Sequence, residues 1–291
     1  MRFRVPSVPL PGRVLPRSDG RMSSQVPGYR RFMPALMPTR NGSTVFMEQL
    51  VDVSAAERFV METRAAHPGL HPTLFHVVLW SLGRMFVEHP HLNRFLAGGR
   101  LYDRDGIWIS FTVRSDMSPD GTLLEVKHRY EPSLPFPEFV GQIEASVAAA
   151  RAGAEGLADK ELALFLHLPP LLRRGVVELA RFADSLNLLP RSFVDGDPFF
   201  ASMFVTNLGS LGIDAAFHHL YEYGTIPMFC TLGRVHDGVV ARDGEPKVAP
   251  VMSLKFSYDE RVEDGHYAAR ALQDLCSTLA DPARAEAQAS R

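Results

Sequence analysis

The sequence has little of what several protein classes require. Its two cysteines, Cys230 and Cys276, are too few for a disulfide framework and lack the spacing of metal ligands. No apolar run reaches the length of a membrane span, and the basic N-terminal segment is broken by prolines where a secretory signal has an apolar stretch. These absences favour a cytoplasmic protein and argue against a membrane partner.

The charges of the chain are balanced. Lysine and arginine number 31 against 33 aspartates and glutamates, so the formal net charge is −2 and there is no overall basic field. Nucleic acid is therefore not expected as a partner. A chain of 291 residues also buries a large core without needing a structural metal or a disulfide.

Prolines and hydrophobic patterns predict the organisation of the chain. Residues 1–28 carry five prolines without hydrophobic periodicity, which predicts an extended arm or linker that could lie on a neighbouring subunit. Residues 29–291 predict one domain in which helical and strand patterns alternate. Strands are expected at 43–53, 107–113, 121–130, 198–207, 226–235 and 249–259, and helices at 72–89, 136–153 and 264–282. A further helix is expected from Ser54, capped by that serine with Glu57 completing a capping box.

Residues 157–195 form an unusually apolar segment. The pattern predicts two short helices separated by Pro169 and Pro170. One interpretation is a helical insertion packed on the body of the domain. The other is a hydrophobic surface for a protein partner, a lipid or a long acyl chain, since large exposed apolar patches mark such sites.

The segment SYDERVEDGHYAAR, residues 257–270, is the strongest candidate site. It predicts a strand, a turn that ends at Asp264 and Gly265, and a helix. A junction of this kind holds side chains between two rigid elements, which suits a preorganised site. The Asp264 carboxylate is placed to accept hydrogen bonds from the free N–H groups at the helix start. A well-capped loop without chemistry is the other interpretation.

This segment resembles the C-terminal signature of the chloramphenicol acetyltransferase-like superfamily, which includes the catalytic cores of the dihydrolipoyl acyltransferases of 2-oxoacid dehydrogenase complexes. Those cores carry DHRxxDG and the chloramphenicol enzymes HHxxxDG, followed by a helix with AAR or a near variant. Arg261, Asp264, Gly265 and residues 268–270 match this frame. The stretches VTNLGSLGID, HPHLNRF and YRRFMP resemble the family's NLG strand and turn, its P-x-x-N motif and its N-terminal arginine pair.

The resemblance covers residues 29–154 and 199–284 and lapses over the apolar segment between them. It implies an α/β fold, a two-layer sandwich in which helices pack on a mixed sheet, with 157–195 as an apolar helical insertion. It also implies a homotrimer or a larger assembly of trimers. The lipoyl and subunit-binding domains of complete dihydrolipoyl acyltransferases have no counterpart in the sequence, so a complete swinging-arm subunit is not expected.

The resemblance further implies roles for individual residues. In the family an imidazole removes a proton from a thiol or hydroxyl, which attacks an acyl thioester, and a hydroxyl on the NLG strand stabilises the oxyanion. The Asp of the DG pair holds the loop together with an N-terminal arginine. By position these roles fall to Thr206 as hydroxyl, to Asp264, and to Arg30 or Arg31, with Asn207, Arg261 and Gly265 as supporting positions. The ordinary alternatives are a plain strand residue at Thr206 and solvated charges at the arginines.

The sequence departs from the family at the base, because Glu260 occupies the position of the catalytic histidine. A carboxylate with a pKa of about 4.3 lies further below a thiol near 8.5 than an imidazole near 6.5, which costs about 3 kcal/mol in proton transfer unless the carboxylate is desolvated. The histidines of HHLYEYG (218–224) and His266 are not expected to replace it. The first two precede a different strand, and His266 opens the helix.

Two functions follow from this departure. The first is an acyltransferase that moves an acyl group between coenzyme A, or a related thiol, and an acceptor, with Glu260 as base and no tightly bound cofactor. The second is a catalytically inactive trimeric scaffold or assembly subunit of a 2-oxoacid dehydrogenase-type complex, with a protein partner at 157–195.

Overall fold

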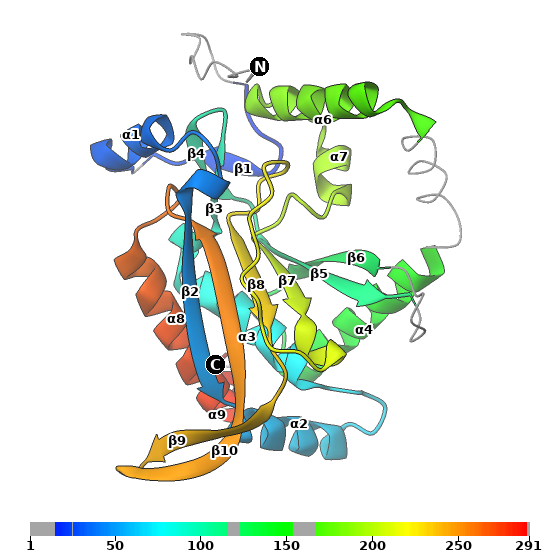
Figure 1. The fold of residues 1–291 in the computed structure, drawn as a ribbon. Coiled ribbons are helices and arrows are strands. Elements are labelled where there is room, and N and C mark those ends of the chain that lie inside the picture. Colours follow the sequence, from blue (N-terminus) through cyan, green and yellow to red (C-terminus); the bar gives the residue numbers. More distant parts are fainter. Residues whose placement is uncertain (1–14, 25, 116–122, 154–166, 290–291) are drawn as a thin grey trace.

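The computed structural model describes residues 15–24, 26–115, 123–153 and 167–289, and its centre is a mixed seven-stranded sheet (Figure 1). The strand order is β2-β10-β8-β7-β5-β6, with β9 paired to β10. The pairs β5–β7 and β7–β8 are parallel and the others antiparallel. The strands are β2 Thr44–Asp52, β5 Ile107–Arg114, β6 Leu123–Tyr130, β7 Met203–Asn207, β8 Met228–Leu232, β9 His236–Arg242 and β10 Glu245–Asp259.

Helices cover one face of this sheet (Figure 1). They are α2 Ser54–Ala66, α3 Leu74–Glu88, α4 Phe136–Gly153 and α8 Gly265–Ala280, and α9 Pro282–Ala289 follows α8. The helix α3, predicted at 72–89, is buried on most sides, and Trp80 at its centre has no exposed surface. The strand β10 turns Leu254, Phe256 and Tyr258 toward this helical layer, because alternate residues of a strand face the same side. The predicted α/β sandwich is therefore confirmed.

A small second sheet lies at one end of the molecule. Its order is β1-β4-β3, with β1 Gly20–Met22, β3 Arg94–Ala97 and β4 Arg100–Arg104. The strand β1 falls inside the predicted arm, and Arg17 before it binds Asp19 and Asp184, both at 2.7 Å. Residues 17–22 thus pack on the rest of the same chain, which corrects the prediction that an extended arm or linker runs through residue 28. Residues 1–14 lie outside the described residues.

The helix starts show a second correction. Ser54 does not cap α2; it is the first helical residue, and its backbone N and Oγ donate to Asp52 Oδ1 at 3.0 and 2.6 Å. A capping box occurs instead at α3, where Thr73 and His76 exchange hydrogen bonds. The side chain of Asp52, two residues before the predicted cap, accepts a hydrogen bond from the first N–H of α2, so Ser54 is part of the helix.

The apolar segment yields two helices in its described part, α6 Pro170–Ser185 and α7 Arg191–Gly196. The first of the two predicted helices, before Pro169, falls mostly on residues 154–166, which lie outside the described residues. No residue of α6 is buried, and Figure 1 shows this helix lying across one end of the molecule, the same end at which α1 Gly28–Leu36 lies. Its exposed apolar side chains are Leu171, Leu172, Val176, Leu179 and Phe182. Among the described helices, none is long and apolar enough to cross a membrane.

Candidate functional site

The loop after β10 is held at its start by a buried ion pair. Asp259 ends the strand, is 1% exposed, and accepts hydrogen bonds from Arg261 Nε at 2.8 Å and Nη2 at 2.7 Å. The hydroxyl of Ser43 donates to the same carboxylate at 2.9 Å. Because a buried charge is tolerated only when it is paired and hydrogen-bonded, this arrangement fixes the backbone on both sides of Glu260.

A second clamp comes from α1. Arg30 is 2% exposed and its guanidinium enters the loop, where Nη1 donates to the Glu260 carbonyl at 3.2 Å and Nη2 donates to Asp264 Oδ2 at 3.3 Å. Arg31, the next residue, is exposed on the helix surface. The structure thus brings Arg30, and not Arg31, to Asp264.

Asp264 also caps the helix that follows. Its Oδ1 accepts a hydrogen bond from the backbone N of Tyr267 at 2.9 Å, and α8 begins at Gly265. The predicted helix cap is therefore confirmed. Asp264 remains half exposed, so the same carboxylate ties α1 to α8 and still faces solvent.

Glu263 completes the cluster, and the sequence analysis did not identify it. The residue is 7% exposed, and its carboxylate lies 2.8 Å from Arg30 Nη2, 3.3 Å from Arg94 Nη1 and 3.0 Å from His91 Nδ1. Its partners come from α1, from β3 and from the turn before β3. No local spacing links positions so far apart in the chain, so only the folded chain shows that Glu263 is a hub.

Glu260 itself lies at the edge of this cluster. Its backbone N donates to the Ser43 carbonyl at 3.0 Å, and the residue is partly exposed. Within the described ranges, no hydrogen bond or ion pair engages its carboxylate. The loop therefore holds Glu260 on a fixed backbone, with a carboxylate that has no bonded partner within these ranges.

Tyr258 lies behind Glu260. Its ring is 2% exposed, and its hydroxyl has no hydrogen-bond partner in the described part of the chain. Burial first, and then the negative charges of Glu260 and Asp264, raises the pKa of Tyr258 to about 12. The phenol therefore stays protonated and remains an unused hydrogen-bond donor beside the loop.

The NLG strand lies elsewhere in the subunit. Thr206, on β7, is partly exposed and its Oγ1 is 3.3 Å from Thr112 Oγ1. Thr206 is the register partner of Thr231 on β8, and Thr231 is the partner of Lys255 on β10. Asp259 is four residues beyond Lys255 and two strands away from Thr206. It therefore lies about 13 Å from Thr206 along the strand direction and about 10 Å across the strands. One subunit does not bring Thr206 and Glu260 together.

The residues after Thr206 form a tight turn. Asn207 Oδ1 accepts a hydrogen bond from Ser210 N at 3.2 Å and caps the 3-10 turn Leu208–Leu211. At Gly209 a Cβ atom would lie 2.5 Å from the Gly233 carbonyl oxygen, so only glycine fits this close approach of two backbones. The Asn and Gly of the NLG motif are thus explained by the geometry of this turn, without a catalytic role.

The other candidate histidines lie apart from the Glu260 loop. His218 stacks on Phe229 of β8 with ring centroids 4.0 Å apart, and His219 stacks on His218 at 4.4 Å. His266 is exposed at the start of α8. None of these three histidines contributes to the cluster around Arg30 and Glu263.

Comparisons with known proteins agree with this architecture. The family model of the 2-oxoacid dehydrogenases acyltransferase (catalytic domain) matches residues 190–286. The probable dihydrolipoamide acetyltransferase of Listeria monocytogenes 4b F2365 superposes with a TM-score of 0.59 at 16% identity, over 89% of this chain and 94% of the other. A chloramphenicol acetyltransferase superposes with a TM-score of 0.50 at 14% identity, over 86% and 94%. The chain has the chloramphenicol acetyltransferase-like fold.

In sequence, part of the chain is also similar to an acyltransferase component of a 2-oxoacid dehydrogenase complex. The dihydrolipoyllysine-residue acetyltransferase component of the pyruvate dehydrogenase complex of Bacillus subtilis (strain 168) is 35% identical over 82 residues. That match spans 28% of this chain and 18% of the relative. The dihydrolipoamide acetyltransferase of Azotobacter vinelandii, studied for the role of a serine, a histidine and an asparagine in its catalytic mechanism, superposes with a TM-score of 0.60 at 21% identity, over 91% and 93%. The predicted resemblance is thereby confirmed.

Proposed function

We propose that the chain transfers an acyl group between coenzyme A, or a related thiol, and an acceptor, in a homotrimer whose active site forms between subunits. The observation that carries this proposal is the separation of Thr206 from Glu260 in one subunit, although both lie in the stretch 190–286 that matches the acyltransferase catalytic-domain model. A cyclic trimer brings one surface of each subunit against a different surface of the next. Glu260 of one subunit then faces Thr206 of its neighbour.

The proposed reaction uses Glu260 as the base. Its carboxylate takes the proton from the acceptor thiol or hydroxyl, and the acceptor's sulfur or oxygen attacks the carbonyl carbon of the acyl thioester. The Thr206 hydroxyl donates a hydrogen bond to the oxygen that becomes negative. The carbon–sulfur bond then breaks, and the leaving thiolate regains the proton from Glu260.

The surrounding ion pairs support this mechanism because they hold the loop that carries Glu260 in place. Arg30 and the Asp259–Arg261 pair fix the backbone on both sides of the base, so the carboxylate needs little reorganisation to meet a substrate. The Azotobacter vinelandii enzyme supplies a parallel, because its histidine and asparagine stand four positions apart, as Glu260 and Asp264 do. Thr206 in place of serine keeps a hydroxyl donor.

Assembly beyond a trimer is part of the proposal. A similar fold occurs in the cubic core of a pyruvate dehydrogenase multienzyme complex, with a TM-score of 0.60, 20% identity, and coverage of 91% of this chain and 93% of the other. A cytoplasmic location also belongs to the proposal, and two free cysteines are consistent with it. No nucleic acid or membrane partner is proposed.

A thiol-release assay tests the activity. Purified protein is incubated with acetyl and longer acyl coenzyme A and a panel of thiol, amine and alcohol acceptors, beside Glu260→Gln and Glu260→His. Turnover that collapses in Glu260→Gln supports the proposal. No turnover in the parent, with turnover gained in Glu260→His, overturns it and indicates an intact site that lacks its base.

One observation favours an inactive scaffold as the second candidate. The apolar side chains of α6 are exposed, with Leu171 at 84% and Leu179 at 66%, and the surface they form suits a protein partner. Leu179→Ser and Phe182→Ser are therefore compared with the parent by analytical ultracentrifugation. A smaller assembly in these variants, without loss of the folded subunit, supports a docking role for α6. An unchanged assembly removes that support.

A further inference from the structure

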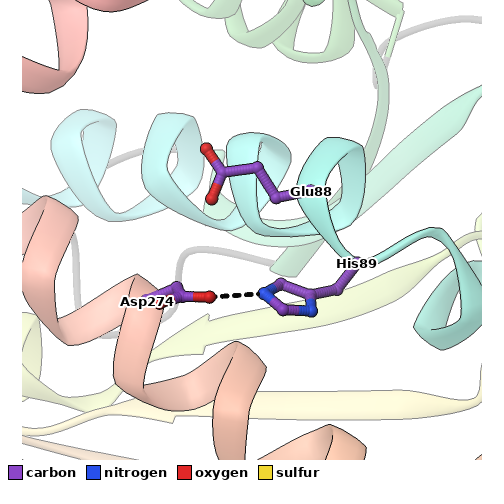
Figure 2. A group of neighbouring side chains, drawn as sticks. All are labelled: Glu88, His89 and Asp274. Carbon is purple, nitrogen blue, oxygen red and sulfur yellow. Dashed lines mark hydrogen bonds and ion pairs between the residues drawn. The ribbon is translucent and has the colours of Figure 1, made fainter.

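A group of three potential metal ligands lies away from the proposed active site. Glu88 ends α3, His89 follows it, and Asp274 lies in the middle of α8 (Figure 2). One ligand atom from each side chain lies within 4.8 Å of the other two. His89 Nε2 and Asp274 Oδ2 are 2.7 Å apart.

The surroundings of His89 hold its ring in place. The residue is 7% exposed, and its backbone N donates to the Met85 carbonyl at 2.8 Å, which closes the last turn of α3. The ring of Tyr267 packs edge-on against the imidazole with centroids 5.4 Å apart. A fixed imidazole binds a cation with little loss of conformational freedom.

The two carboxylates leave room for further ligands. The side chains of Glu88 and Asp274 are 45% and 51% exposed, so water has access to the remaining coordination positions. The last turn of α3 also favours a cation, because the carbonyl groups at a helix C-terminus carry partial negative charge. Arg84 opposes binding, since its Nη2 lies 3.3 Å from Glu88 Oε1 and must release that carboxylate.

We propose that Glu88, His89 and Asp274 form a binding site for a divalent transition-metal ion such as Zn²⁺ or Co²⁺. One imidazole nitrogen and two carboxylate oxygens suit such ions, whereas Ca²⁺ and Mg²⁺ prefer oxygen ligands alone. The ion replaces the proton between His89 Nε2 and Asp274 and joins the end of α3 to α8. Because α8 begins at the Glu260 loop, the site stabilises the helix pair on which that loop is built.

Calorimetry with ZnCl₂ and CoCl₂ tests the site, with an untagged full-length chain that has been treated with a chelator. The expected result is one saturable site per chain that weakens at least tenfold in Asp274→Asn and in Glu88→Gln. Both substitutions keep the shape of an exposed side chain, so folding is retained. His89→Gln is a third variant, read only if its circular dichroism matches the parent.

His71→Gln is the matched control. His71 also lies near a carboxylate, with its Nδ1 3.6 Å from Glu144 Oε1, but it belongs to no three-ligand group in the described residues. Zinc is expected to raise the melting temperature of the parent and of His71→Gln equally, and to raise that of Asp274→Asn by less at the same zinc concentration. No binding by the parent overturns the proposal, and so does equal binding by all variants, which indicates scattered surface histidines.

Discussion

Arg30 and Asp264 lie 234 positions apart in the sequence, and their side chains meet at 3.3 Å. The same guanidinium reaches Glu263 at 2.8 Å and the carbonyl of Glu260 at 3.2 Å. One buried arginine thus joins α1 to the loop that carries the proposed base. A residue far away in the sequence therefore holds the loop in place. Loss of Arg30 is expected to lower both the stability of the protein and its proposed activity.

Replacing Arg30 by methionine is expected to lower the free energy of unfolding by about 3–5 kcal/mol, because it leaves buried carboxylate charge with fewer partners. Urea unfolding measures the loss. Arg31→Met is the control, since Arg31 is exposed and its loss is expected to cost less than about 0.5 kcal/mol. Equal losses in the two variants contradict the clamp.

A mixing experiment tests the site between subunits. Thr206→Ala and Glu260→Gln are each expected to be inactive alone. When the two proteins are unfolded together and refolded as mixed trimers, each mixed trimer gains one interface with both intact residues, and random mixing restores roughly a quarter of the parent activity. The thiol-release assay measures this recovery.

The control for mixing is Glu260→Gln refolded alone, followed by addition of separately refolded Thr206→Ala. No recovery is expected there, because the subunits do not exchange. If refolding the two variants together restores nothing although the trimers form, Thr206 and Glu260 do not act across one interface.

The imidazole of His76 makes folding sensitive to acid. Burial lowers the pKa of His76 from 6.5 to about 4, against the opposing charge of Glu144. The unfolded chain therefore binds more protons between pH 4 and 6.5, so stability is full above about 6.5 and falls as the pH is lowered through this window. Urea unfolding at pH 7.0, 5.5 and 4.5 measures the slope.

Two variants separate His76 from the other histidines. In His76→Gln the decline in stability between pH 7.0 and 4.5 is expected to become shallower, since no imidazole remains at this position to be protonated. His71→Gln, whose side chain is 83% exposed, is expected to keep the parent slope. If the stability of His76→Gln falls with pH as steeply as that of the parent, another group causes the acid sensitivity.

The sequence predicted the local features of the site better than its long-range contacts. Asp264 was correctly expected to cap α8, because a cap depends on residues within three positions of each other. The role of Glu263 was missed, because its partners Arg30, His91 and Arg94 are brought to it only by folding.

The same distinction explains the errors in the fold. The core helix α3 and the strand β10 followed from hydrophobic periodicity, which the folded core enforces. Ser54 and Glu57 matched a capping pattern, but Asp52 at the end of β2 took the helix start instead. The strand β1 was missed because prolines surround a short segment whose pairing with β4 gives no local signal.

Cysteine chemistry distinguishes direct acyl transfer from transfer through an acyl-cysteine. Cys230 has no exposed surface, and burial raises the pKa of its thiol far above the usual range. Burial also raises the pKa of Cys276 to about 11, so at pH 8 only on the order of a thousandth of that group is the reactive thiolate. Neither thiol is expected to react with a disulfide reagent in the folded protein, and both should react in guanidinium.

The functional consequence is measured by mass spectrometry after incubation with acyl coenzyme A. No acylated cysteine is expected, and Cys276→Ala should retain the parent turnover, because in the proposed mechanism Glu260 activates the acceptor rather than an enzyme nucleophile. Cys230→Ala is less useful, since the loss of a fully buried side chain lowers stability through a cavity. An acyl group found on Cys276, together with loss of turnover in Cys276→Ala, would replace the direct mechanism with one through a covalent thioester.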